Sequence, residues 1–321
     1  TLKSETPTAY GLHPNAEIGF KLREAEAFCQ SVLNLQPRTA GGEGGLSEEE
    51  RAKQVLDDIV EKLPDIFDME DIRNRCDGDF SPYTMVAIQE AERMNVVIVE
   101  MKRSLIELDL GLKGDLTMTG PMESLMSSLA SNQTPGSWAI LAYPSLRPLA
   151  SWFLNLLQRY EQLVGWTSEL AVPVSVWLSG LFNPQSFLTA VKQTTARRNE
   201  WPLDKTEVIT EVTKRVSKEQ VEAAARDGAY IHGLTMEGAR WDEKAMCLED
   251  SLPKQLFCPL PVILVKAVQV DRADIKDAYQ TPVYTTEARF RQEVFTAQLK
   301  SKTGQLKWIL AGVAAFLDVV L

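Results

Sequence analysis

The sequence predicts an α+β fold, in which an N-terminal multi-helix subdomain is followed by a C-terminal antiparallel β subdomain. Two patterns support this class. Apolar residues recur at steps of three and four up to about residue 200, as in helices. Beyond Trp201 and Pro202, six short β-branched or aromatic runs follow one another, separated by Gly, Pro and polar turns. Such a series predicts an antiparallel sheet or a small barrel.

Six helices are expected in the first part of the sequence. They run from Asn15 to before Pro37, from Ser47 to Pro64, over 84–110, over 121–129, over 146–166, and onward from Pro184. The second begins with a capping box, because Glu50 follows Ser47 at a distance of three residues. The longest carries a stripe of Met94, Ile98, Met101, Leu105 and Leu108, the spacing with which one helix packs along another.

Six strands are expected in the second part, over 208–213, 229–236, 261–270, 280–285, 293–299 and 306–316. The spacing of Val208, Val212 and Val216 is also compatible with a helix. A strand is favoured because β-branched residues are stiff in helices and fit a pleated surface. The segment 300–304 reads as a hairpin loop between the last two strands.

The charge balance argues against nucleic acid and membrane partners. Of the 321 residues, 34 are Lys or Arg and 44 are Asp or Glu, which gives a net charge of −10 with no basic block. The most apolar run, Trp308 to Leu317, is too short to span a bilayer, which needs about 20 residues. Because the sequence opens on Thr1-Leu2-Lys3 without an initiator Met, we expect a piece of a longer polypeptide, although trimming or processing would give the same start.

No constellation that could carry catalysis, a metal or a cofactor is visible in the sequence. The glycines at 41–45 lack the Lys and Ser/Thr of a phosphate-binding loop, so a flexible interhelical loop is expected there. Neither His13 nor His232 has a neighbouring carboxylate or a second ligand at metal spacing. The scattered Cys29, Cys76, Cys247 and Cys258 are expected to be reduced thiols that behave as small buried apolar groups in a cytosolic compartment.

The seven tryptophans divide into two groups. Trp152 and Trp308 are flanked by apolar residues and are expected in the core. Trp201-Pro202 and Trp241-Asp242 lie at predicted boundaries, where corner packing and a role in an interface are both open. From the residues alone, the protein is a two-part globular segment with a structural or interaction role.

Several sequence segments together resemble one family, the C-terminal region of dynein heavy chains. They are Tyr10-Gly11-Leu12-His13-Pro14-Asn15-Ala16-Glu17-Ile18, Tyr143-Pro144-Ser145-Leu146, residues 177–190 (WLSGLFNPQSFLTA), residues 196–205 (ARRNEWPLDK), residues 228–234 (GAYIHGL), residues 236–242 (MEGARWD), Pro282-Val283-Tyr284, and Lys307-Trp308-Ile309-Leu310-Ala311. They occur in the family's order and span nearly the whole sequence. The amino-acid sequence at 187–205 and 105–117 is most similar to that of axonemal, flagellar outer-arm β-type dyneins.

The resemblance implies a fold and a role. In this family a helical region is followed by an incomplete antiparallel β-barrel, here of six strands, which lies across one face of the AAA+ motor ring. It implies a non-catalytic cap that braces the ring and modulates ATP-driven, minus-end-directed movement along microtubules in ciliary and flagellar beating. The parent is a microtubule-dependent ATPase whose ATP and Mg²⁺ sites and stalk lie upstream. No catalytic or cofactor-binding residue is therefore carried onto this protein.

The same resemblance implies partners, location and subdomains. The partners are the AAA+ modules of the same heavy chain, and for the parent also microtubules and other dynein chains. The location is the cytoplasm and cytoskeleton, in the axoneme of a cilium or flagellum. Residues 1–20 are expected to end the sixth AAA+ module or its linker, 21–200 to form the helical subdomain, and 201–321 the barrel.

Two other classes of function are open. A stand-alone enzyme would require a phosphate-binding loop or catalytic constellation that the sequence does not display. A protein-interaction adaptor would be favoured by a solvent-exposed Met/Leu stripe on the helix at 84–110, since large exposed apolar patches mark partner sites.

The surface around Trp201, Arg240 and Trp241 is a hypothesis for ring docking, because aromatic and Arg residues stand at a predicted subdomain junction. In the parent motor, Trp241→Ala is then expected to change velocity or force more than it changes the melting temperature of the isolated segment. A collapsed melting temperature with unchanged motor output would show that Trp241 acts only in packing.

Overall fold

The fold was obtained as a computed structural model, which describes residues 7–10, 12–35, 46–76, 78, 80–273, 277–289 and 293–320. The glycine-rich loop expected at 41–45 lies outside these residues. The polypeptide divides into two compact units. Unit 1 comprises Thr1–Pro37, Val174–Ser179 and Pro184–Val319; unit 2 comprises Arg38–Pro173, Gly180–Asn183 and Val320–Leu321. The subdomain limits at residues 20 and 200 stay predictions.

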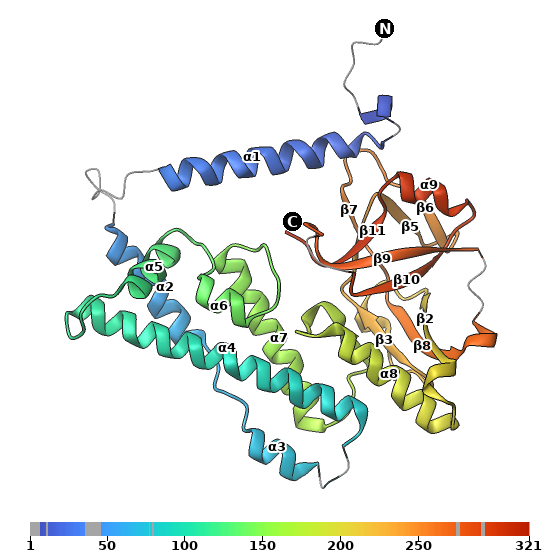
Figure 1. The fold of residues 1–321 in the computed structure, drawn as a ribbon, viewed down its shortest axis with the longest axis horizontal. Coiled ribbons are helices and arrows are strands. Elements are labelled where there is room, and N and C mark those ends of the chain that lie inside the picture. Colours follow the sequence, from blue (N-terminus) through green and yellow to red (C-terminus); the bar gives the residue numbers. More distant parts are fainter. Residues whose placement is uncertain are drawn as a thin grey trace. The chain divides into compact units, whose positions relative to one another are not determined.

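Unit 2 is helical. Its helices are α2 (Glu48–Lys62), α3 (Met69–Arg75), α4 (Pro82–Lys113), α5 (Gly120–Ala130), α6 (Gly136–Leu141) and α7 (Leu149–Glu169). The long α4 packs against all the others (Figure 1). The four helices predicted in this region are confirmed to within a few terminal residues. The short α3 and α6 were not predicted, because seven and six residues are too few for a periodic pattern to stand out.

Local sequence signals fix the ends of these helices. The predicted capping box of α2 is present: Ser47 Oγ accepts from the Glu50 backbone N–H at 3.1 Å, and Glu50 Oε2 accepts from the Ser47 N–H at 2.8 Å. The α4 helix begins with Pro82 in its first turn and ends at Gly114, whose φ is 84°.

The predicted stripe of α4 is the centre of the unit 2 core. Met94, Ile98, Met101, Leu105 and Leu108 are each 0% exposed. The exposed stripe that would favour an adaptor is therefore not formed by these residues. Trp138 and Trp152 stack with their ring centroids 6.1 Å apart, and the Trp138 indole N–H donates to Ser104 Oγ on α4 at 2.9 Å. The prediction of a core position for Trp152 is confirmed.

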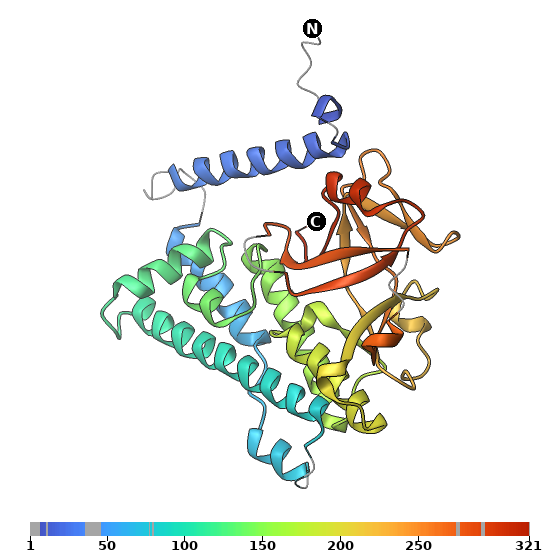
Figure 2. The ribbon, with the colours of Figure 1, turned by 45° about the vertical axis from the view of Figure 1, so that its right-hand side comes forward.

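Among the described residues, unit 1 contains three α-helices and all of the β-strands. The helices are α1 (Asn15–Leu35), α8 (Pro184–Asn199) and α9 (Gln305–Leu310). The strands are β1 (Ser175–Trp177), β2 (Thr206–Val212), β3 (Ala229–His232), β4 (Thr235–Glu237), β5 (Ala239–Asp242), β6 (Cys247–Asp250), β7 (Phe257–Pro259), β8 (Ile263–Gln269), β9 (Ala278–Thr286), β10 (Phe295–Lys300) and β11 (Ala314–Asp318). The α8 helix covers β2 and β8 (Figure 2).

The strands form three sheets, in the orders β1-β3-β8-β2, β10-β9-β11-β4-β7 and β5-β6. Over the part of the sequence that the structure describes, their ladders do not close into a barrel. The expectation of purely antiparallel pairing is wrong for β1 with β3 and for β11 with β9, which are parallel. The second case follows from connectivity, because β10 and α9 intervene between β9 and β11 and return the backbone to its starting direction.

The strand expected at 306–316 is wrong in its first half. Gln305–Leu310 forms the short helix α9, and Gly312, with a φ of 67°, precedes the strand β11. A continuous apolar run does not distinguish a strand from a helix by periodicity. The local constraint is Trp308, which is 1% exposed and donates its indole N–H to Ser301 Oγ at 2.7 Å. Core burial of Trp308 is as predicted.

The cysteines are all unpaired thiols. Cys76 and Cys247 are buried, as expected, but Cys29 is exposed on α1, which corrects the prediction for that residue. Within the described ranges, no helix combines the length and the apolar character needed to cross a bilayer.

Gly228, directly before β3, is a position where the structure has no room for a side chain. Its φ is 92°, and an added Cβ would lie 2.1 Å from the carbonyl oxygen of Val265 on β8. We predict that Gly228→Ala lowers the free energy of unfolding by about 3 kcal/mol or more, since strain and a backbone clash add. Gly165→Ala in α7 is the control, because nothing lies within 4 Å of its added Cβ. It should stabilise by about 0.5–1 kcal/mol in urea unfolding. Equal stabilities of the two variants would contradict the prediction.

Candidate interaction surface

The three residues predicted for ring docking lie on two elements of unit 1. Trp201 lies two residues after the end of α8, is half-buried, and donates its backbone N–H to the Ala196 carbonyl at 2.9 Å. Arg240 and Trp241 are neighbours on β5, opposite Glu249 and Leu248 of β6. Because strand side chains alternate, these two point to opposite faces of the hairpin. Among the residues that the structure describes, no hydrogen bond or ion pair joins Trp201 to the other two.

Arg240 and Trp241 differ in exposure. The Arg240 guanidinium pairs with Glu249 and lies 3.7 Å from a carboxylate oxygen of Asp242, with 27% of its side chain exposed. Trp241 is only 6% exposed. Its indole N–H and the Arg240 Nε are buried without a hydrogen-bond partner among the described residues. Trp241 therefore packs inside unit 1 in this structure, and the docking role of the three residues stays a prediction.

The start of α1 is fixed firmly to unit 1 by Asn15. Its side-chain amide donates to the carbonyls of Leu252 at 3.0 Å and Gln255 at 2.8 Å, and its oxygen accepts from the Lys254 N–H at 2.9 Å. His13 Nδ1 accepts from the Asn15 N–H at 3.1 Å. One buried residue therefore makes three bonds to a loop about 240 residues away in sequence and sets where the helix begins.

Beyond Asn15, α1 exposes an apolar face that we call the α1 stripe. It consists of Leu22, Ala25, Phe28, Cys29 and Val32, which fall on one side of the helix at steps of three and four. All five are exposed, with Phe28 at 70% and Leu22 at 56%. Phe20, on the opposite side, is 59% exposed. The spacing predicted the helix but did not indicate that this face is uncovered. An uncovered apolar helix face is typical of a surface that binds another protein segment.

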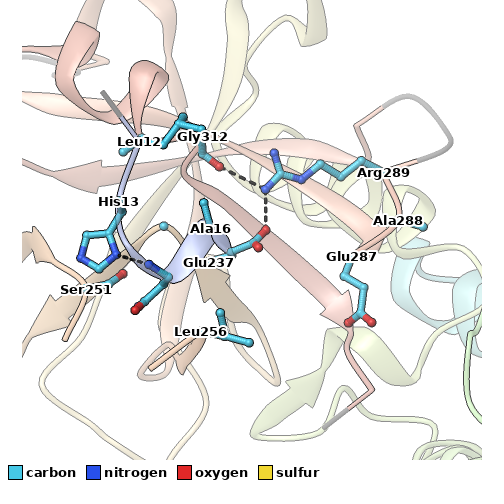
Figure 3. A pocket seen from close by; sticks show the side chains of 13 residues that line it. Leu12, His13, Ala16, Glu237, Ser251, Leu256, Glu287, Ala288, Arg289 and Gly312 are labelled. Atoms are coloured by element: carbon cyan, nitrogen blue, oxygen red, sulfur yellow. Dashed lines mark hydrogen bonds and ion pairs between the residues drawn. The ribbon is translucent and has the colours of Figure 1, made fainter. Parts of the chain in front are cut away.

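A pocket of about 500 Å³ lies beside the first turn of α1 (Figure 3). One of its lining side chains is Arg289, which donates to Glu237 at 2.6 Å and to the Gly312 carbonyl at 3.1 Å. The guanidinium also lies 5.2 Å from the ring centroid of Phe316. The Arg and the carboxylate thus already satisfy each other. Across the described ranges, no group of three or more His, Cys, Asp and Glu side chains is arranged to hold a metal ion.

Comparison with known proteins identifies the family. Residues 22–317 match the C-terminal domain of the dynein heavy chain. The protein belongs to this family. It is 69% identical over 318 residues to the dynein beta chain of the flagellar outer arm of Chlamydomonas reinhardtii, a match that covers 98% of this sequence and 7% of the relative. Identity is 52% to the ciliary dynein beta chain of Heliocidaris crassispina and 48% to human dynein axonemal heavy chain 17, each covering 99% of this sequence and 7% of the relative.

The resemblance found in the sequence, to axonemal dyneins and to outer-arm beta chains in particular, is confirmed. The 321 residues span about 7% of the length of these dynein heavy chains. The rest of such a protein, with whatever activity it carries, lies outside this dynein C-terminal domain.

Unit 2 of the dynein C-terminal domain holds a buried charge cluster that the sequence analysis missed. Glu90 on α4 is 1% exposed and accepts the backbone N–H groups of Phe182 and of Asn183, the latter at 2.9 Å. Burial raises the pKa of the Glu90 carboxyl, and these two N–H groups together with Arg93 and Arg159 oppose the rise. The signal in the sequence was the position of Glu90, four residues before Met94 on the buried stripe.

Arg159 of α7 completes this cluster. It is 2% exposed and donates to Asn155 at 2.7 Å and to the Leu181 carbonyl at 3.3 Å. Its guanidinium carbon lies 3.3 Å from the ring centroid of Tyr143, a cation–π contact. Tyr143 in turn meets the edge of Phe182. Glu90 and Arg159 together hold residues 181–183, the piece of unit 2 that leads directly into α8.

In unit 1, His232 at the end of β3 is held in its neutral form. Its Nδ1 lies 2.9 Å from Ser175 Oγ on β1. Burial lowers the pKa of His232 to about 4, Lys218 adds to the decrease, and Glu219 opposes it.

This pKa predicts a specific loss of stability in acid. The folded value lies below the unfolded value of about 6.5, so between these pH values the unfolded protein binds more protons and stability falls as the pH falls. We expect His232 to account for about 2 kcal/mol between pH 6.5 and 4, less than the full shift implies because the ring is partly exposed. In urea titrations at several pH values, His232→Asn should lack this component. Parallel losses in the two proteins would contradict it.

Proposed function

We propose that this protein is the non-catalytic C-terminal element of a ciliary or flagellar outer-arm dynein heavy chain, where it braces the AAA+ ring and modulates movement along microtubules. Membership of the family and 69% identity to an outer-arm beta chain support the assignment to the axoneme. ATP hydrolysis, with its Mg²⁺, and microtubule binding belong in this proposal to the upstream part of the heavy chain. The partner of this segment is the AAA+ ring of the same polypeptide.

The observation that carries the bracing role is the α1 stripe. Leaving Leu22, Phe28 and Val32 in water forgoes about 1.5–3 kcal/mol for each side chain that a partner could bury. Asn15 bonds the first turn of the helix to unit 1, and an isolated helix of 21 residues is marginal without a partner along its length. A further part of the heavy chain that covers the α1 stripe would supply the missing packing.

Modulation requires more than attachment. A cap changes the ring's conformational equilibrium only when its contact free energy differs between the ring's conformations. A helix that is fixed to unit 1 at one end and docked along its length is suited to this, because displacement of the docking surface alters many apolar contacts together.

We also propose that the strands of unit 1 correspond to the incomplete barrel of the family. Gln298 of β10 and Thr210 of β2 form hydrogen bonds with each other at 2.6–3.0 Å, and these bonds join the edges of two sheets.

The test compares Phe28→Glu with Phe20→Glu in the intact heavy chain. Both substitutions place a charge at an exposed Phe of α1, but only Phe28 lies on the α1 stripe. Burying the charge at position 28 should cost several kcal/mol of docking free energy. We expect Phe28→Glu to change microtubule gliding velocity and to speed proteolysis near α1, and Phe20→Glu to resemble the wild type.

Both variants of the isolated segment should melt as the wild type does, because both side chains are already exposed. Equal gliding velocity and proteolysis of the two heavy-chain variants would overturn the proposal that the α1 stripe docks.

A further inference from the structure

The loop that connects β2 with β3 presents a serine in a distinctive charge setting. Its sequence is Lys214-Arg215-Val216-Ser217-Lys218, with basic residues two and three positions before the serine and one directly after it. Lys214, Val216, Ser217 and Lys218 are exposed, Val216 by 50%. This cluster takes no part in the docking role proposed above, and it stands independently of that role.

The backbone of this segment has the form that an enzyme cleft can accept. Ser217 is extended, with φ −133° and ψ 161°. Upstream, the Arg215 carbonyl accepts from the Val262 N–H at 2.9 Å, which fixes the segment to the sheet on one side. Downstream, the backbone bonds are local to one turn, from the Gln220 N–H to Ser217 and from the Val221 N–H to Lys218. Entry into a cleft therefore requires rearrangement of that turn, including the bond from the Val216 N–H to Gln220 Oε1 at 2.7 Å.

The serine hydroxyl already has an acidic neighbour. The proximity of this hydroxyl holds the pKa of the Glu219 carboxyl below its ordinary value. The Arg215 guanidinium lies over Tyr230, 4.8 Å from the ring centroid. Ser217 thus lies between one carboxylate and three cations, Lys214, Arg215 and Lys218.

A second serine shows why exposure matters. Ser104 directly follows the basic pair Lys102 and Arg103, but it is 8% exposed on α4 and donates to the Glu100 carbonyl at 2.8 Å. No enzyme could reach it without unfolding the helix. Basic neighbours together with an extended, exposed backbone are found at Ser217 and not at Ser104.

We propose that Ser217 is a phosphorylation site for a serine kinase that selects basic residues before the acceptor. Such a kinase recognises its substrate through an acidic cleft that complements Lys214 and Arg215. In the transfer, Ser217 Oγ forms a bond to the γ-phosphorus of MgATP while the bond from that phosphorus to the bridging oxygen breaks. ADP leaves, and the hydroxyl proton passes to the catalytic carboxylate of the kinase.

The phosphate changes the local balance of charge. It brings a charge of about −1.5 to −2 and replaces the hydroxyl that lowers the pKa of Glu219. Repulsion from Glu219 and attraction to Arg215 and Lys218 should reorganise the turn at 218–220. The loop is therefore a position at which one modification alters the charged surface of unit 1 without disturbing its core.

The test uses the folded protein, MgATP and a serine kinase of this specificity, with intact mass and peptide mass spectrometry as the readout. We expect one phosphate at Ser217, its loss in Ser217→Ala, and at least tenfold slower transfer in the Lys214→Gln, Arg215→Gln double variant. Ser124→Ala is the matched control, because Ser124 is also exposed but follows Glu123. It should be modified as the wild type is.

Undiminished incorporation in Ser217→Ala would overturn the proposal. So would phosphorylation of Ser217 in the heat-unfolded protein but not in the folded one, since the loop would then be inaccessible. Circular dichroism of each variant checks that a slower rate does not arise from loss of fold.

Discussion

The buried carboxylate of Glu90 is the contact on which the path of the backbone depends. Residues 180–183 belong to unit 2, while the residues on either side of them belong to unit 1. Glu90 satisfies two backbone N–H groups of this short segment, and Arg159 satisfies a carbonyl beside them. Removal of one partner from a buried, hydrogen-bonded charge leaves the others unsatisfied, at a cost of about 3–5 kcal/mol. Pro184 and the whole of α8 begin directly after this anchor.

The two units differ in how completely their apolar helix faces are buried. In unit 2 the stripe of α4 from Met94 to Leu108 is buried and Trp138 stacks on Trp152, so its helices support one another. In unit 1, α8 packs against β2 and β8. The α1 helix is fixed by Asn15, but its α1 stripe is exposed. A helix that is hydrogen-bonded to its domain at one end and exposes an apolar face beyond it is expected in a domain that completes its packing in a larger assembly. Membership of the family of dynein C-terminal domains fits that physical picture.

Most elements were predictable where the signal is short in range. The capping box of Ser47 and Glu50, the stripe of α4 and the β-branched run of β2 each express their preference within a few residues. Strands of three residues, such as β7, and helices of six or seven residues, such as α3, carry too little periodic pattern to be recognised. The segment 306–316 was misassigned in its first half because an apolar run suits a strand or a helix, and the hydrogen bond of Trp308 to Ser301 accompanies the helix.

The sequence alone determined the helical and β-rich halves, the helix ends and the family, because all of these depend on spacing and order along the polypeptide. It did not determine which apolar faces are covered. The stripes of α1 and α4 have similar spacing, yet one is exposed and the other fully buried. Trp241, for which corner packing and an interface role were both open, is buried. Glu90, which no local pattern singled out, accepts N–H groups from residues more than 90 positions away. Burial and long-range hydrogen bonding depend on which residues the tertiary structure brings together, and the spacing of residues along the sequence does not predict those contacts.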